Sequence, residues 1–278
     1  MPQTAKRIMT RYWKPGTDFL RVIVDSVADS CEADDIIAVS EKAIAVAMGL
    51  VVDESQVRPG LLAKFLARIW MRLVWGYILG PICHLNAKTL WRLRRYPIPE
   101  GEAHKEVALK HAGFAQALLH YSEGGIDVTN LPYTLASLPL SNPMGVAEEV
   151  SAAIRANCGK EISVMLIDTD KTYSRHGIHL TCRPDALRGI RPLGLLAVIL
   201  GRMLRWKARA TPLAMRGRQL SLDETLEIAN LADRAMGHGA GGTVWDMARR
   251  FRVGITEVTW EMLDRIPHYP IVRVRKID

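Results

Sequence analysis

The sequence has 278 residues, of which 49% are hydrophobic and 24% are charged, which is the composition of a folded globular protein in one domain or two closely joined ones. Its four cysteines lie far apart and form no C-x-x-C pair, so the sequence indicates neither a structural zinc site nor a disulfide framework. The N-terminal residues include no apolar run of signal-peptide length, and we therefore expect a cytoplasmic protein.

The net charge of +8 is distributed unevenly along the chain. No acidic residue occurs between Glu54 and Glu100 or between Asp185 and Asp223, whereas both stretches are rich in lysine and arginine. Such fields attract polyanions, including nucleotides, phosphorylated cofactors, nucleic acid and anionic membrane surfaces. A merely solvated basic face explains the same pattern equally well, so charge alone leaves the partner open.

The first predicted elements are a short strand followed by a helix. Residues 36–39 are apolar and come after a turn that contains Asp34 and Asp35. Ser40 then supplies an N-cap for a helix that ends at Gly49.

A basic amphipathic helix is predicted over residues 61–77, with Lys64, Arg68 and Arg72 at every fourth position. Three charges argue against a transmembrane span. We expect its apolar face to pack on the core or on a second subunit, and contact with a membrane surface is the alternative. The following residues 88–99 contain prolines and are predicted to be a linker.

The middle of the chain alternates between helical and extended signals. Residues 102–120 indicate a helix, and residues 131–140 indicate an extended segment punctuated by proline. Asn142 and the proline after it are typical of a helix start, and this helix is predicted to run through Asn157.

The C-terminal third contains a strand, a capped helix and a final strand. Residues 162–168 are apolar and rich in β-branched side chains, which predicts a strand with Asp168 at its end. Ser221 and Glu224 form a capping box for a helix that stops before the glycine-rich residues 237–242. Residues 271–275 read IVRVR, in which apolar and basic side chains alternate from Val272 to Arg275, as expected of an edge strand.

Two aspartates in turn-like surroundings are the strongest local candidates for chemistry. Asp127 in EGGIDVTN and Asp168 in LIDTDKT are each followed by small hydroxyl or amide side chains, an arrangement suited to Mg²⁺ or Mn²⁺. An aspartate in a turn often serves only as a partner of the backbone, so either motif alone is weak. The glycine-rich segment GHGAGG lacks the lysine and the spacing of a P-loop.

Four segments in a fixed order resemble the coenzyme F420-0 γ-glutamyl ligase family: DDIIAVSEKAIAVAMG, SEGGIDVTNLP, VAEEVSAAIRANCGKEISVMLIDTD and RGRQLSLDETLEIANLADRAMGHGAGG. The resemblance covers roughly residues 10–50 and 110–250. It implies an α+β fold with a mixed sheet and packed helices, in an intertwined homodimer that binds GTP and divalent metal, Mg²⁺ or Mn²⁺, between its subunits. It also implies a catalytic domain over residues 1–251, with a basic amphipathic insertion at about 56–99 and a C-terminal extension at 252–278.

The resemblance also assigns roles to individual residues. It implies that Asp127 and Asp168 act in catalysis and bind metal together with Thr169. Asn130 matches a residue that contacts the nucleotide. The last two assignments are Lys42 as a nucleotide-contacting lysine and Gln219 as a residue near both the nucleotide and the metal.

The reaction implied is the joining of L-glutamate to a carboxylate through an acyl phosphate. GTP or ATP supplies the phosphoryl group, and the acceptor is a deazaflavin, a folate or another carboxylate. The sequence departs from the family pattern at Val46, where a lysine is expected, and at Asp170-Lys171, which replaces the usual continuation after the Asp-Thr pair. A non-catalytic homologue that binds anionic membrane or nucleic acid is therefore the alternative, whereas the ligase itself is expected to need no nucleic acid.

Overall fold

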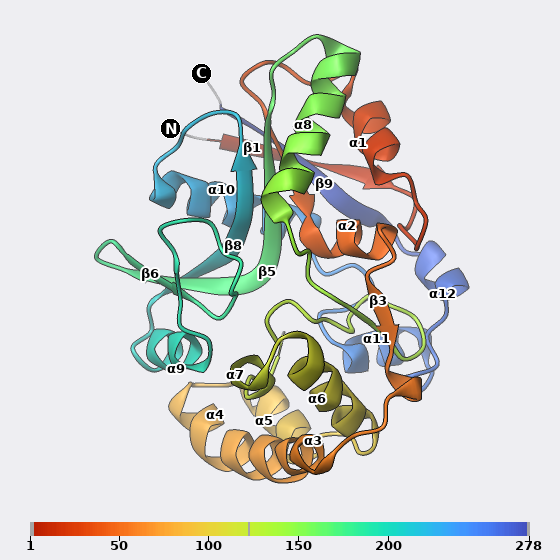
Figure 1. Ribbon diagram of the computed structural model, residues 1–278, viewed down its shortest axis with the longest axis vertical. Helices are drawn as coiled ribbons and strands as arrows, with labels where there is room; N and C mark the ends of the chain where they lie inside the picture. The colour runs from red at the N-terminus through yellow and green to blue at the C-terminus, as the bar shows by residue number, and fades with distance from the viewer. Residues whose placement is uncertain (1–2, 122, 277–278) are drawn as a thin grey trace.

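A mixed β-sheet forms the upper part of the protein in Figure 1, and a group of helices forms the lower end. The computed structural model describes residues 3–121 and 123–276. The sheet has the order β1-β9-β2-β5-β6-β7, with β8 also paired to β5. Its strands are β1 (Gln3–Thr10), β2 (Ile36–Ser40), β5 (Ser163–Arg175), β6 (Ile178–Thr181), β7 (Arg191–Pro192), β8 (Lys207–Arg216) and β9 (His268–Lys276).

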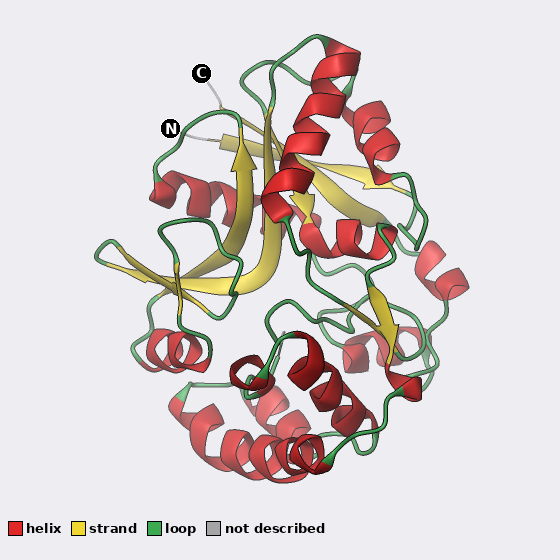
Figure 2. Cartoon of the chain, viewed as in Figure 1, coloured by secondary structure: helices red, strands yellow, loops and turns green. Residues whose placement is uncertain are grey.

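Helices cover both faces of this sheet (Figure 2). Ile37 and Val39 of β2 point into a core formed with α1 (Phe19–Val27), α2 (Glu41–Ala47) and α8 (Pro143–Cys158). Ile36 and Ala38 point to the opposite face, where α10 (Leu222–Met236) packs. The alternation of side chains along a strand thus buries β2 on both faces, which explains its continuous apolar sequence.

Two helices predicted from capping signals, α8 and α10, are confirmed together with their caps, and the helix predicted after Ser40 is α2, although the side chain of Ser40 makes no capping hydrogen bond. Asn142 accepts a hydrogen bond from the backbone N–H of Gly145 at the start of α8, and Gly159 ends that helix in the left-handed conformation. Ser221 and Glu224 form the predicted capping box of α10, and Gly237 follows its last residue. Local side-chain to backbone bonding was therefore sufficient to place these ends.

The prediction that residues 271–275 form an edge strand is wrong. They belong to β9, which pairs antiparallel with β1 on one side and with β2 on the other. Arg273 and Arg275 reach the buried carboxylate of Asp35, so basic residues here do not signal an open edge. The alternating pattern reports which face is buried, and it carries no information on how many neighbours a strand has.

The predicted strand at residues 162–168 is also longer than expected, because it does not end at Asp168. β5 continues to Arg175 and pairs with β8 both before and after Asp168. The register shifts between the pairs Asp168–Thr211 and Lys171–Ala210, so two extra residues form a bulge at this point.

The lower end of the molecule, which we call the helical end, is built from residues 54–117. Its elements are η1 (Glu54–Gln56), α3 (Leu61–Phe65), the π-helical η2 (Leu66–Leu79), α4 (Gly80–Ile82), α5 (Ala87–Arg94), α6 (Glu100–His111) and α7 (Phe114–Ala117). The predicted helix over 61–77 is confirmed as α3 and η2. The linker predicted at residues 88–99 is wrong for its first part, because Asn86 caps α5 through the N–H of Thr89.

The remaining elements connect the two parts. α9 (Leu195–Met203) packs its buried side chains against the same core cluster as η2 and α5. β3 (Val51–Asp53) pairs with β4 (Leu135–Ser137), while α11 (Val244–Phe251) and α12 (Trp260–Asp264) lie on the right in Figure 1. The α+β fold class with a mixed sheet is thus confirmed, and the homodimer and the domain limits stay predictions. No helix among the described residues is long and apolar enough to cross a bilayer.

Candidate functional site

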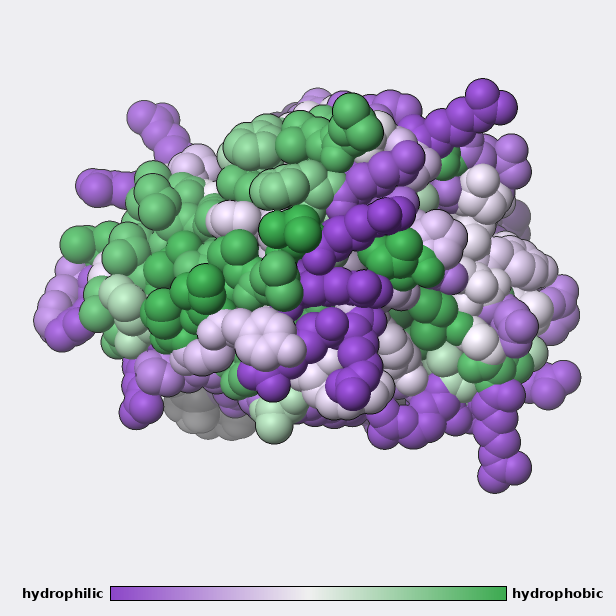
Figure 3. Space-filling view, turned by 90° about the horizontal axis from the view of Figure 1, so that it is seen from below, coloured by the Kyte–Doolittle hydropathy of each residue, from purple (hydrophilic) through white to green (hydrophobic). Residues whose placement is uncertain are grey.

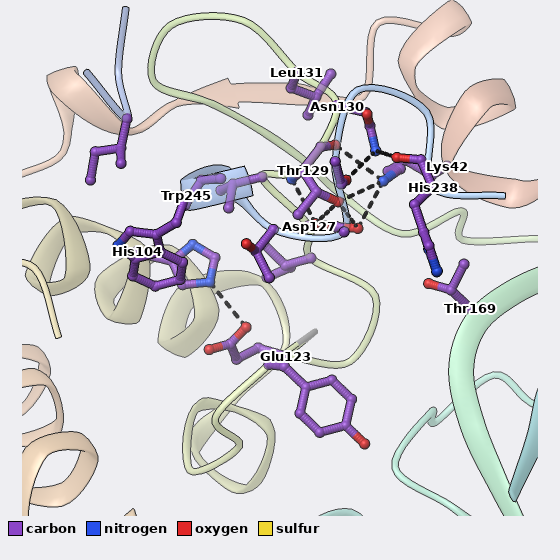
Figure 4. Close-up of a pocket in the computed structure, with 18 of the residues that line it drawn as sticks. Lys42, His104, Glu123, Asp127, Thr129, Asn130, Leu131, Thr169, His238 and Trp245 are labelled. Carbon is purple, nitrogen blue, oxygen red and sulfur yellow. Dashed lines mark hydrogen bonds and ion pairs between the residues drawn. The ribbon is translucent and has the colours of Figure 1, made fainter. Parts of the chain in front are cut away.

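A cleft of about 950 Å³ lies between the sheet and the helical end. Figure 4 shows that its labelled side chains converge from segments that are far apart in the sequence. The lining segments include the start of α2, residues 126–135, the β5 bulge, the loop from Gly237 to Trp245, and residues 84–104 of the helical end.

Lys42 and Asp127 form an ion pair at the centre of this cleft. Lys42 Nζ lies 2.8 Å from Asp127 Oδ2 and also donates to the hydroxyl of Thr129 at 3.0 Å. The backbone N–H of Thr129 donates to Asp127 Oδ1 at 2.7 Å. Burial alone would raise the pKa of Asp127, but Lys42 and the Thr129 hydrogen bonds hold it below its ordinary value, so Asp127 is a carboxylate at neutral pH.

Asn130 organises the glycine-rich loop that follows α10. Its side-chain nitrogen donates to the carbonyl oxygens of His238 and Gly241 at 3.2 Å, and its side-chain oxygen accepts from the N–H of Ala240 at 2.7 Å. Asn130 itself has a positive φ of 56°, a conformation that asparagine tolerates better than most residues. The side chain predicted to contact a nucleotide thus shapes a loop of exposed backbone, and a direct nucleotide contact stays a prediction.

The bulge in β5 presents two residues to the cleft. Thr169 and Asp170 both line it, and the next residue, Lys171, forms an ion pair with Asp233 of α10 at 3.0 Å. Bulges redirect side chains in this way because the extra residues leave the regular ladder. The bulge therefore explains how a continuous strand delivers cleft residues from its middle.

Asp168 does not line the cleft, although it begins the bulge. Its Oδ2 lies 3.3 Å from Nε of Arg183, whose side chain is fully buried. A second carboxylate, Glu41, lies 3.6 Å from the same guanidinium. Burial, opposed by Arg183, raises the pKa of Glu41 to about 7.

Arg183 also connects this buried group to the loop that carries Asp127. Its NH1 group donates to the carbonyl oxygen of Gly124 at 3.0 Å. Gly125 has a φ of 104°, and a β-carbon there would clash with the guanidinium, so glycine is required at this point. Asp168 and Asp127 therefore belong to one structure joined through Arg183, rather than to one set of cleft-lining carboxylates.

A second charged group occupies the helical side of the cleft. The ring of His104 lies between two carboxylates, with Nδ1 2.6 Å from Glu54 and Nε2 3.0 Å from Glu123. Lys105, which is fully buried, approaches Glu123 at 2.5 Å. Burial lowers the pKa of His104, but the two carboxylates outweigh it and raise the pKa to about 10, so the ring is an imidazolium that donates from both nitrogens.

The helical end is joined to α11 across the cleft by Asp246. Lys88 and Arg92 of α5 each approach Asp246 Oδ1 at 2.8 Å, and the guanidinium of Arg92 lies 5.1 Å from the centre of the Trp245 ring. The hydrogen bond from Arg92 holds the pKa of Asp246 well below its ordinary value. The basic insertion is thus one wall of the cleft and not a separate appendage.

The structure separates the four predicted metal ligands. Asp127 and Thr169 line the cleft, whereas Asp168 faces Arg183 and Gln219 is exposed beside the start of β5, next to Arg218, whose N–H donates to Ser163. Among the described residues there is no group of three or more carboxylate, histidine or cysteine side chains arranged to hold an ion. The metal roles of all four residues stay predictions.

Of the residues predicted from the sequence, Lys42, Asp127, Asn130 and Thr169 line the cleft, and sequence reasoning missed Arg183, His104 and Asp246. Each of the missed residues bonds to a partner that is distant in the chain: His104 to Glu54, 50 positions away, Arg183 to Gly124, 59 positions away, and Asp246 to Arg92, 154 positions away. The lone Arg183 in TCRPD and His104 in EAHKE carry no motif. The glycine pair of SEGGID was the available signal, because consecutive glycines indicate a close approach of other groups to the backbone.

Comparison with known proteins agrees with this architecture. The family described as F420-0:gamma-glutamyl ligase matches residues 7–245. An uncharacterized protein of Methanocaldococcus jannaschii is 34% identical over 281 aligned positions, which cover 96% of this chain and 94% of that protein. The chain therefore belongs to the F420-0:gamma-glutamyl ligase family.

Proposed function

We propose that the protein is a nucleotide-dependent γ-glutamyl ligase that joins L-glutamate to a carboxylate acceptor. The observation that carries this proposal is the convergence of Lys42, Asp127 and the Asn130-bound glycine loop in one cleft of a chain that belongs to a ligase family. A lysine ammonium is suited to phosphate oxygens, and so are backbone N–H groups of a glycine-rich loop, although those of Gly237, Ala240 and Gly241 are already bonded within the protein.

The proposed reaction has two steps, a phosphoryl transfer and an acyl transfer. A carboxylate oxygen of the acceptor attacks the γ-phosphorus of GTP or ATP, the bond to the bridging β–γ oxygen breaks, and the nucleoside diphosphate leaves. The amine of glutamate then attacks the acyl carbon, the carbon–oxygen bond to phosphate breaks, inorganic phosphate leaves, and the nitrogen loses a proton. Positioning and charge neutralisation are the main demands that phosphoryl transfer places on a protein.

The residues of the cleft supply these demands. Lys42 is held in place by Asp127 and Thr129, so its ammonium needs little reorganisation to meet a phosphate oxygen. His104 is held as a cation by Glu54 and Glu123 on the opposite wall, where it neutralises these carboxylates and fixes the wall that faces Lys42. The helical wall contributes Leu85, Leu93 and Tyr96, whose apolar surfaces exclude water from the reacting groups.

We include a divalent ion, Mg²⁺ or Mn²⁺, in the proposed reaction because the chain belongs to this ligase family. The carboxylate of Asp127 fits such an ion, because magnesium in nucleotide sites is usually held by one or two carboxylates together with substrate phosphates, and the hydroxyl of Thr169 lines the same cleft. When bound, it neutralises negative charge on the phosphoryl oxygens. Asp168 and Gln219 do not fit this role within one chain, and a contribution of Gln219 would have to come from the partner of the proposed homodimer.

Phosphate release tests the proposal. We expect release from GTP or ATP that requires Mg²⁺ or Mn²⁺, L-glutamate and an acceptor, which is screened among F420-0, folates and other carboxylates. Lys42→Met and Asp127→Asn are each expected to lower the rate at least roughly 100-fold. Asp25→Asn, on the exposed surface of α1, is the matched control and should retain activity.

The product identifies the reaction independently of phosphate release. Mass spectrometry should show the acceptor heavier by one or more glutamate residues joined through an amide. Phosphate release that is unaffected by either cleft variant, or that occurs without amide formation, would contradict the assignment.

A further inference from the structure

The helical end carries two apolar faces on a single helical segment. Ala67, Met71 and Trp75 of η2 are fully buried against the core of this end. On the other side, Phe65, Ile69 and Leu73 are 51%, 42% and 50% exposed. A helix that is apolar on opposite faces is normally covered on both, and the described residues cover only one.

The exposed face extends beyond this helix. Figure 3 views this end of the molecule from below and shows apolar side chains gathered over its left and upper parts, beside a band of hydrophilic ones. Tyr77 and Ile78 at the end of η2 are exposed as well, and neighbouring elements add further exposed apolar side chains: Leu61 of α3, Trp91 of α5, Leu196 of α9 and Leu204 directly after α9. An exposed apolar area of this kind marks an interaction surface, since soluble monomers rarely keep one.

The charge of the same elements narrows the choice of partner. α3, η2, α4 and α5 lie within the acid-free stretch between Glu54 and Glu100, and α9 lies within the second such stretch. Arg94 and Arg95 are exposed with their guanidinium groups 4.4 Å and 4.7 Å from the ring centres of Tyr77 and Trp91. One cation of the predicted basic stripe, Arg68, is partly neutralised by Glu102 of α6 at 2.5 Å.

We propose that this face docks the protein on the surface of an anionic lipid bilayer. Apolar and aromatic side chains flanked by arginine are the features with which helices lie in the interface of a membrane. A second copy of the chain is disfavoured as the occupant, because two-fold symmetry would bring the same cationic groups face to face. The segment that forms the face also lines the cleft through Leu85, Arg92 and Tyr96, so docking orients one wall of the cleft toward the membrane.

Vesicle sedimentation with the full chain tests the docking. We expect binding to vesicles that contain phosphatidylcholine with about one third phosphatidylglycerol, weak binding to phosphatidylcholine alone, and partial release at about 0.5 M salt, where exposed charges are screened. Ile69→Glu/Leu73→Glu should weaken binding to the anionic vesicles roughly tenfold or more, because it places acids on the docking face. Met9→Glu is the matched control, since Met9 is 66% exposed on β1, and it should bind like the unmodified protein.

Two further measurements separate the outcomes. Ile69→Ser/Leu73→Ser removes the apolar side chains with less risk to folding, and circular dichroism verifies that each variant is folded. Light scattering in solution reports the number of subunits. Absence of binding to anionic vesicles, or equal binding by the docking-face variants and Met9→Glu, overturns the proposal. So does a change from dimer to monomer in the docking-face variants without any vesicle binding, which would assign the face to a second copy.

Discussion

Arg183 joins three segments of the chain with a side chain that has no access to solvent. Its guanidinium lies between Asp168 and Glu41 and donates to Gly124, next to the loop that holds Asp127. Removing one member of a buried charge cluster leaves the other charges without a counter-ion. This destabilises a protein by more than replacing the whole cluster with apolar side chains does. Arg183 therefore stabilises the fold and positions the cleft, although it does not line it.

Replacing Arg183 tests this role. Arg183→Met is expected to lower the free energy of unfolding by about 3–5 kcal/mol in urea denaturation, because the carboxylate of Asp168 loses its counter-ion and Glu41 loses a neighbouring cation. Burial raises the pKa of Glu41 to about 7 even with Arg183 present, so Glu41 is protonated once the arginine is gone, and adding Asp168→Asn should recover part of the loss. A loss no larger than that of Arg21→Met on the exposed surface of α1 would contradict the role assigned to Arg183.

His104 makes the stability of the folded protein depend on pH at neutral to alkaline values. Its pKa is raised from 6.5 to about 10 in the folded state, so the folded protein binds the proton more tightly than the unfolded chain. This stabilisation is fully present below pH 6.5 and is lost as the pH rises toward 10, at up to about 1.4 kcal/mol per pH unit. Denaturant unfolding measured from pH 6 to pH 10 should show this decline, and His104→Gln should flatten it.

Features that depend on residues close together in the sequence could be predicted from it, whereas features that depend on distant segments could not. α8 and α10 were predicted from Asn142 and from the Ser221–Glu224 box, because each cap is made within three or four residues. The central place of β9, the continuation of β5 past Asp168 and the partners of Arg183 depend on segments that are distant in the chain. Periodicity says which face is buried, but it does not say what buries it.

The glycine loop after α10 depends on Asn130, which makes three hydrogen bonds to its backbone. Asn130→Gly removes the amide and keeps a residue that accepts positive φ, whereas Asn130→Ala adds backbone strain to the same loss. Both should increase amide hydrogen exchange in residues 238–242 and raise the KM for the nucleotide. Asn130→Ala should also cost roughly 1 kcal/mol more in stability. Unchanged exchange in Asn130→Gly would mean that the loop is held by other contacts.

α5 and α11 are coupled through Arg92 and Asp246, which connect the helical wall to the opposite side of the cleft. A double-mutant cycle with Arg92→Met and Asp246→Asn should give a coupling free energy of about 1–2 kcal/mol, since Arg92 is almost fully buried and the hydrogen bond is charge-assisted. The same cycle on the exposed pair Arg155 and Glu161 serves as the comparison and should give less than about 0.5 kcal/mol. Equal values for the two pairs would show that the Arg92–Asp246 contact has no special role.

The last strand of the chain lies inside the main sheet, next to the first strand. β9 lies between β1 and β2, and Ile271, Val272 and Val274 are buried on the two faces of the sheet. The N-terminal strand β1 has β9 as its partner in the sheet order, so the two ends of the chain depend on each other. The C-terminal residues are consequently part of the main core.

Truncation after Ile266 distinguishes a core strand from a dispensable extension. Loss of β9 removes the pairing partner of β1 and uncovers β2, and unpaired strands in a sheet favour aggregation. We expect the truncated chain to be insoluble or to lack cooperative unfolding. Val272→Ala removes only two methyl groups from a buried side chain, so it should fold and lose about 1–3 kcal/mol in the free energy of unfolding. Val272→Asp buries an unpaired carboxylate and should behave like the truncated chain. A soluble truncated protein with a cooperative transition and intact phosphate release would instead mean that β1 and β2 fold and position Lys42 without their shared neighbour.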